Sequence, residues 1–260
     1  MLTYPDINPI LLQIGPLKIH WYGMMYLAGF GMAWWLGNRR LRNNKIFTSE
    51  QLSDLIFYAA VGIVLGGRLG YILFYDLANY IEEPLNMLKI WQGGMSFHGG
   101  FVGVLIAVWL YARKLNLPFF QVTDFIAPLI PFGLGAGRIG NFINGELWGR
   151  HTDVPWGMVF SKIDNIPRHP SQLYQAILEG LVLFIILWIF SKRPRPTMAV
   201  SGLFLICYGL FRFLIEFVRE PDYNLGFIAF DWMTMGQILT IPMLIVGIVL
   251  IKLAYRRMDF

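Results

Sequence analysis

Apolar stretches long enough to cross a membrane recur along the chain, and shorter polar segments separate them. A helix needs about 17 to 25 mostly apolar residues to span the hydrocarbon core of a bilayer. Helices buried in lipid and protein are apolar on nearly all sides, so the length of a stretch counts for more here than its periodicity. The pattern predicts seven membrane-spanning helices, near residues 19–37, 53–75, 98–112, 119–136, 172–190, 200–217 and 236–254.

The composition agrees with a protein that crosses the membrane several times. Hydrophobic residues make up 56% of the chain and charged residues 14%, and the mean hydropathy is +0.54. These values lie outside the range of ordinary soluble domains. We therefore expect an all-α integral membrane protein, a single bundle of seven transmembrane helices.

Basic residues gather in every second connection between the predicted spans. Lys and Arg favour the cytoplasmic side in the short loops of membrane proteins. The basic groups follow the first, third, fifth and seventh spans: Arg39, Arg40, Arg42 and Lys45; Arg113 and Lys114; Lys192, Arg193 and Arg195; Lys252, Arg256 and Arg257. This alternation predicts an N-terminus outside and a C-terminus in the cytoplasm. The segments 76–95 and 146–171 are then expected to form a small extracytoplasmic head.

Charge, cysteine and histidine content argue against several classes of site. A net charge of +5 and a pI near 9.3 would suggest nucleic-acid binding in a soluble protein, but basic loops beside a membrane face anionic lipid instead. Cys207 is the single cysteine, and in an apolar span it is expected to be structural rather than nucleophilic. His98, His151 and His169 lack the spacing of a metal site. We therefore expect no nucleic-acid partner, no metal and no cofactor.

Glycines recur at a spacing of four in two of the predicted spans. Gly62, Gly66 and Gly70 lie in the second span, and Gly133 and Gly137 lie in the fourth. Small residues at this spacing let membrane helices approach closely. We interpret these glycines as packing positions.

Ionisable residues inside the predicted spans are candidates for function. An arginine at the centre of a membrane helix costs roughly 2.5 to 3.5 kcal/mol on insertion scales. Tyr208, Arg212 and Glu216 are four residues apart in the sixth span, so a helix places them on one face. A functional site is one interpretation of this face. A structural ion pair between Arg212 and Glu216 is the alternative.

A polar run in these apolar surroundings, residues 137–150, follows the fourth span. Its polar and glycine positions include Arg138, Gly140, Asn141, Asn144, Gly145, Glu146, Gly149 and Arg150. Polar groups on irregular backbone at membrane depth are tolerated where they line a cavity. The guanidinium group suits phosphate because it donates two parallel hydrogen bonds. We predict that Arg138 and Arg212 bracket one phospholipid head group.

Glycines also flank a histidine at the start of the third span, in the run 93–100. They allow a ligand or a backbone to approach His98, whose imidazole is suited to proton transfer near neutral pH. A helix-capping or interfacial position is the alternative for this residue. For Arg68, in the second span, there are two alternatives. It belongs to a functional site, or its long side chain reaches the membrane interface and places the guanidinium group there.

At these residues the chain resembles the bacterial prolipoprotein diacylglyceryl transferases. The resemblance rests on the run 137–150, the face of Tyr208, Arg212 and Glu216, and the segments 20–23, 96–100, 168–174 and 219–222. It implies that residues 1–260 form one transmembrane catalytic domain. The implied reaction moves the diacylglyceryl group of phosphatidylglycerol to the lipobox cysteine thiol of a preprolipoprotein, forms a thioether and releases glycerol-1-phosphate.

The resemblance also implies where the protein works and what it binds. It places the chain in the bacterial cytoplasmic (inner) membrane, with the active site toward the periplasmic side. Its partners would be phosphatidylglycerol, the preprolipoprotein signal peptide and membrane lipids. For the leaving phosphate, we assign Arg138 and Arg212 as the clamp. Tyr208 and Glu216 are assigned to hold Arg212 in place.

The attacking thiol makes a separate demand, because its reference pKa of about 8.5 means that a base helps to form the thiolate. His98 is the candidate base, and Tyr22 is its competitor or hydrogen-bonding partner. Asn141 and Glu146 are expected to orient the glycerol or the loop. Gly149 is expected to keep the backbone close to the substrate.

Two other classes of function fit part of the pattern. A transporter or lipid flippase would also place arginines and a histidine in a central cavity. A membrane scaffold would use the same residues as structural ion pairs. Polar groups at the outer ends of three spans favour the enzyme, because a relay to both sides of the membrane is lacking in the sequence.

Overall fold

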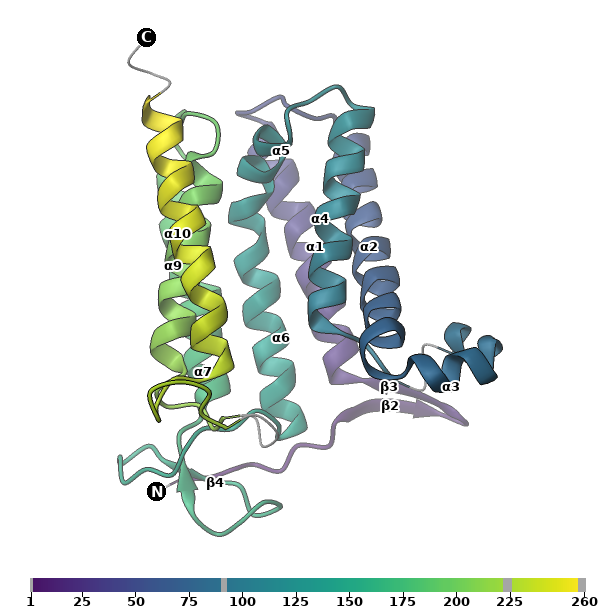
Figure 1. Cartoon of the computed structure of the whole chain (residues 1–260), viewed down its shortest axis with the longest axis vertical. Helices are drawn as coiled ribbons and strands as arrows, with labels where there is room; N and C mark the ends of the chain where they lie inside the picture. The colour runs from purple at the N-terminus through teal and green to yellow at the C-terminus, as the bar shows by residue number, and fades with distance from the viewer. Residues whose placement is uncertain (1, 90–92, 222–225, 257–260) are drawn as a thin grey trace. The chain divides into compact units, whose positions relative to one another are not determined.

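The computed structural model describes residues 2–89, 93–221 and 226–256, and these are mostly helical (Figure 1). The α-helices are α1 Trp21–Leu41, α2 Ser49–Tyr75, α3 Leu77–Glu82, α4 Phe97–Lys114, α5 Phe119–Ile126, α6 Ile130–Asn144, α7 Ser171–Gln175, α8 Leu183–Phe190, α9 Ala199–Ile215 and α10 Met235–Arg256. Three tighter or wider helical turns accompany them: η1 Pro84–Leu88, η3 Ala127–Leu129 and the π-helical η4 Ala176–Val182.

The length and apolar composition of the helices are those of a membrane protein. Four of those described are long and apolar enough to cross a bilayer, and α9 is a shorter apolar helix. The four are Ser49–Tyr75, Phe119–Asn144, Ser171–Phe190 and Met235–Arg256. Each of the seven predicted ranges falls largely on a helix, although residues 19 and 20 belong to a strand. The count of seven membrane spans and the orientation of the two ends stay predictions.

Short strands accompany the helices, and the hydrophobic pattern does not predict them. β2 (Ile10–Ile14) and β3 (Leu17–His20) form an antiparallel hairpin. β1 (Leu2–Thr3), β4 (Met158–Val159) and β5 (Pro167–Arg168) form a sheet in the order β1-β4-β5. The predicted head segment 146–171 contains β4 and β5. The segment 76–95 contains α3 and η1, and its residues 90–92 lie outside the described part. That these segments form one head stays a prediction.

The chain folds into two compact units, residues 1–35 with 124–260 and residues 36–123. In the second unit α2 packs on α4, and glycines form the contact. A Cβ atom on Gly62 would lie 2.7 Å from the carbonyl oxygen of Gly103, and one on Gly99 would overlap the carbonyl of Gly66. The interpretation of the glycines in the second span as packing positions is confirmed. In the fourth span Gly133 packs on Gly29, but a Cβ on Gly137 would meet no heavy atom within 4 Å among the described residues, so the interpretation is wrong for Gly137.

Arg68 has a structural role within the second unit. Its side chain is buried and donates hydrogen bonds to backbone carbonyl oxygens of Asn86, Met87 and Gly93 at 2.6, 3.0 and 2.5 Å. Arg68 therefore ties the segment that follows α3 to α2.

Within the first unit, Asp124 fixes the start of α9. Its carboxylate accepts hydrogen bonds from the backbone nitrogens of Met198 and Ser201, each at 2.7 Å. A carboxylate is well placed there, because the first backbone N–H groups of a helix have no partner within the helix. Asp124 therefore anchors the helix that carries Arg212.

Candidate functional site

A cluster of half-buried arginine and fully buried glutamate side chains joins α6, η4 and α9 in the first unit. Arg138 of α6 donates from Nε and Nη2 to the same oxygen of Glu179, at 3.3 and 3.2 Å. The Nη1 atom of Arg212, on α9, lies 3.9 Å from the other oxygen of Glu179. The Glu179 side chain is fully buried. The structure therefore brings the two predicted phosphate-clamping arginines together on one carboxylate.

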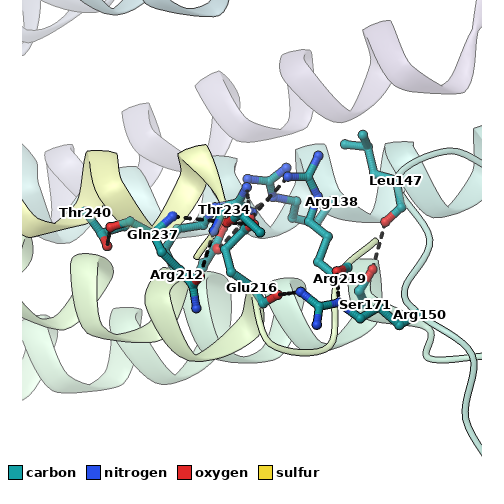
Figure 2. A network of polar contacts seen from close by, with 11 residues as sticks. Arg138, Leu147, Arg150, Ser171, Arg212, Glu216, Arg219, Thr234, Gln237 and Thr240 are labelled. Carbon is teal, nitrogen blue, oxygen red and sulfur yellow. Dashed lines mark hydrogen bonds and ion pairs between the residues drawn. The ribbon is translucent and has the colours of Figure 1, made fainter. Parts of the chain in front are cut away.

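A second carboxylate, Glu216, fixes the other side of Arg212 (Figure 2). It lies 2.5 Å from Arg212 Nη2 and 3.1 Å from Arg219 Nη1, and it accepts a 2.7 Å hydrogen bond from the Thr234 hydroxyl. Tyr208 interacts electrostatically with Arg138 and Arg212. Glu216 therefore pairs directly with Arg212, and the roles of Glu216 and Tyr208 in orienting that arginine stay predictions.

Positive charge exceeds negative charge in this cluster. Arg150 joins it by donating to the backbone carbonyls of Glu216 and Arg219, at 3.1 and 2.9 Å. Among the residues that the structure describes, four formal cations and two formal anions leave an excess of two positive charges; the cations are Arg138, Arg150, Arg212 and Arg219, and the anions are Glu179 and Glu216. Buried charges need compensating partners. The cluster is therefore suited to an anionic ligand.

Two atoms of the cluster also lack hydrogen bonds. Arg212 Nη1 and Glu179 Oε1 are both buried, and neither has a hydrogen-bond partner among the described residues. A buried polar group without a partner costs about 1 to 3 kcal/mol. A phosphate oxygen would accept the hydrogen bond that Arg212 Nη1 leaves unmade.

The sequence prediction did not include Glu179, which the π-helical turn η4 places beside the arginines. Single π-helical turns inside α-helices are frequent at functional sites. Gly180 follows Glu179 and packs on Gly135 of α6, so closely that a Cβ on Gly180 would lie 2.8 Å from the Gly135 Cα. The two glycines bring the helices near enough for Glu179 to reach Arg138. The available signal was a carboxylate inside the apolar range 172–190.

The polar run after α6 forms a loop that is held by its own side chains. Gly145 ends the helix in the left-handed conformation, with φ of 68°. Asn141 and Asn144 donate to Oε1 of Glu146 at 2.9 and 3.1 Å. Tyr22 of α1 interacts electrostatically with Glu146 and Arg138. Tyr22, Asn141 and Glu146 therefore lie in the neighbourhood of Arg138, and their roles toward a substrate stay predictions.

Gly149 makes a close approach to the protein's own backbone. A Cβ atom there would lie 2.5 Å from the Val218 carbonyl oxygen and 2.6 Å from that of His169. The Gly149 nitrogen also donates to the His169 carbonyl at 2.9 Å. The glycine thus lets two neighbouring segments close on residue 149, and its predicted contact with substrate stays a prediction.

We expect Gly149→Ala to destabilise the fold, because backbone atoms at this distance must shift. Overpacking typically costs about 1 to 3 kcal/mol, or several degrees in melting temperature for a protein of this size. Thermal unfolding in detergent measures the effect. Gly31→Ala is the control, because a Cβ on Gly31 would have no heavy atom within 4 Å among the described residues. Equal melting temperatures for both variants would contradict this explanation.

Arg168, in the segment 146–171, supports the same region. Its guanidinium lies 2.6 Å from Asp164 and 3.1 Å from Glu220, and it donates to the Gly149 carbonyl at 3.2 Å. The hydrogen bond from Arg168 lowers the pKa of Asp164. The segment 168–174 therefore holds the loop that carries Gly149.

His98 lies in the second unit, in the first turn of α4, and its side chain is exposed. The capping position of this helix belongs to Ser96, whose hydroxyl accepts a hydrogen bond from the Gly99 nitrogen at 3.2 Å. The capping alternative for His98 is therefore wrong. Its assignment as a base stays a prediction. No group of three or more His, Cys, Asp or Glu side chains in the described ranges is arranged to hold a metal.

The sequence matches proteins of one family over nearly its full length. The family model described as Prolipoprotein diacylglyceryl transferase matches residues 9–253. A relative from Pseudomonas aeruginosa, named phosphatidylglycerol-prolipoprotein diacylglyceryl transferase, is 60% identical over 258 residues, covering 99% of this chain and 97% of the relative. The equally named protein of Azotobacter vinelandii is 60% identical over 259 residues, covering 99% and 98%. The chain therefore belongs to the prolipoprotein diacylglyceryl transferase family.

Proposed function

We propose that this protein transfers the diacylglyceryl group of phosphatidylglycerol to the lipobox cysteine thiol of preprolipoproteins. A thioether forms and glycerol-1-phosphate leaves. Family membership supports the reaction. The structural observation that carries the proposal is the pair of half-buried arginines, Arg138 and Arg212, on the fully buried Glu179, in a cluster with surplus positive charge.

Negative charge develops on the phosphate during the reaction. The thiolate sulfur attacks the glycerol carbon that bears the phosphate oxygen, a carbon–sulfur bond forms, and the carbon–oxygen bond breaks. The bonding electrons stay on the departing oxygen, so the phosphate changes from a diester into a more negatively charged monoester. Fixed cations that face this developing charge stabilise the transition state. Arg138 and Arg212 are assigned to this role, with Asn141, Glu146 and Gly149 shaping the substrate site.

The substrate thiol must lose its proton, and we assign His98 or Tyr22 to receive it. For His98→Gln we expect turnover near pH 7 to fall about 100-fold, the low end for general-base catalysis. The loss should shrink toward pH 9, because a thiol of reference pKa about 8.5 then ionises without help. Turnover of a lipobox peptide measured from roughly pH 6 to 9 tests this, since that window spans the imidazole and thiol reference values. Unchanged activity throughout would transfer the assignment to Tyr22.

We also propose one transmembrane domain in the bacterial inner membrane, with seven spans, an outer N-terminus and a cytoplasmic C-terminus. The active site then faces the periplasm, and 76–95 and 146–171 form the head. The alternating basic loops support this orientation. A C-terminal epitope tag that antibody reaches in cells whose inner membrane is intact would contradict it.

The mass of a lipobox peptide tests the proposed function against the competing ones. Purified protein is incubated with phosphatidylglycerol and the peptide, and the cysteine is expected to gain the mass of one diacylglyceryl group. Movement of labelled lipid between leaflets without any gain in peptide mass would favour a flippase. A folded protein that does neither would favour a scaffold.

A further inference from the structure

We infer that Glu179 is a positioning residue that shares Arg138 and Arg212 with the phosphate of the bound lipid, and that its charge speeds the departure of glycerol-1-phosphate. The inference rests on the proposed function, because it assumes that these arginines bind the phosphate of phosphatidylglycerol.

The first observation is the position of the carboxylate. Glu179 lies on η4, whereas its two partners lie on α6 and α9, so it contacts both arginines across helix boundaries. Its side chain is fully buried, and a buried carboxylate stays charged only beside compensating cations. Arg138 and Arg212 supply those cations, and Glu179 in turn reduces the repulsion between them.

The second observation is that Glu179 leaves the arginines incompletely bonded. Arg138 directs two nitrogens at a single oxygen, at 3.2 and 3.3 Å, although charge-assisted hydrogen bonds are typically about 2.7 to 2.9 Å long. Arg212 Nη1 is 3.9 Å from the other oxygen, beyond hydrogen-bond length, and both atoms are buried. Glu179 thus offsets part of the positive charge of the pair, while a donor of Arg212 stays available to a ligand oxygen.

The third observation is the local backbone. The π-helical turn and the contact between Gly135 and Gly180 both occur beside Glu179. The π-helical turn and the close contact between these two glycines together fix the direction in which the Glu179 carboxylate points. Packing alone does not need a carboxylate at this point, because an apolar side chain of similar size would fill the same space.

The balance of charge around the phosphate changes during the reaction, and the change favours release of the product. A phosphodiester with one negative charge joins the four arginines and two carboxylates of the cluster, so four positive charges face three negative ones. After the carbon–oxygen bond breaks, the monoester carries up to two negative charges, and four negative charges face four positive ones. Loss of the surplus positive charge weakens the hold on glycerol-1-phosphate. Glu179 therefore favours release of the product over its retention.

Glu179→Gln tests this inference, because it keeps the size of the side chain and removes its charge. We expect glycerol-1-phosphate to bind about tenfold more tightly in a calorimetric titration, and both kcat and the KM for phosphatidylglycerol to fall about tenfold. Glu50→Gln removes the same charge from an exposed residue of the other unit and should leave all three values unchanged. A purely structural role predicts a lower melting temperature without tighter product binding.

Equal or weaker binding of glycerol-1-phosphate by folded Glu179→Gln protein would overturn the inference. Where that variant does not fold, Glu179→Asp keeps the charge and should bind glycerol-1-phosphate within about twofold of the unmodified protein; a tenfold change would overturn it equally. Failure of the proposed function is distinguishable, because it appears in the unmodified protein as a lipobox peptide that gains no diacylglyceryl mass.

Discussion

Replacing Arg212 by lysine should lower turnover by about 100-fold or more while the amount of folded protein stays the same. Lysine keeps the positive charge but loses the planar fork that donates two directed hydrogen bonds. In the structure one arm of Arg212 lies 2.5 Å from Glu216, and the other points toward Glu179. The three donors of a lysine ammonium share one nitrogen, so they cannot reach Glu216 and a phosphate oxygen with the spacing of the two guanidinium arms. Loss of one preorganised donor to a developing anion typically costs 100-fold to 1000-fold in rate.

The control for this substitution is Arg193→Lys, an exposed residue between α8 and α9. It makes the same chemical change away from the arginine cluster and should retain full turnover. Rates are compared at equal concentrations of folded protein, with initial formation of modified peptide as the readout. Full turnover of the Arg212→Lys protein would show that two-armed binding by this residue is unnecessary.

Arg138→Ala should abolish measurable transfer, with a loss of about 1000-fold, and should also destabilise the protein. Removal of one partner of a buried ion pair typically costs about 3 to 5 kcal/mol, because the remaining charge is left uncompensated. Glu179 is fully buried, and Arg138 is its nearest cation at 3.2 Å. The stability loss and the rate loss therefore have different causes.

The double variant Arg138→Ala with Glu179→Ala separates those causes. Removing the Glu179 carboxylate, which has lost its nearest cation, should restore much of the melting temperature. The phosphate still lacks the guanidinium group of Arg138, so transfer should stay absent. Melting temperature and initial rate are measured on the same preparations. If the double variant regains turnover together with stability, Arg138 serves the fold alone, as the scaffold interpretation holds.

The helices could be predicted from the sequence because their signal is local. Each membrane-length apolar stretch becomes a helix, since a bilayer leaves the backbone few other ways to satisfy its hydrogen bonds. The strands lack a local signal. β1 has two residues, and its Leu2 pairs with Met158 of β4. Such pairing depends on contacts between distant parts of the chain, which the hydrophobic pattern does not encode.

The same distinction separates the predicted site residues from those that were missed. Tyr208, Arg212 and Glu216 share one helix face, so their spacing alone places them together. Glu179 has its charged partners on other helices, and no spacing rule connects it to Arg138. A carboxylate in an apolar span is costly, and this cost is the one local signal that marks Glu179 as a candidate site residue. Arg150 was part of the polar run, but its contacts with residues 216 and 219 follow only from the fold.

The most direct test of the account counts both products of one reaction. Purified protein, phosphatidylglycerol and a lipobox peptide are mixed, and thioether-linked peptide and free glycerol-1-phosphate are quantified over time. The account predicts that the two products appear together in a one-to-one ratio, and that both disappear with Arg212→Lys. Modified peptide without glycerol-1-phosphate, or no modified peptide from folded protein and intact lipid, would contradict it.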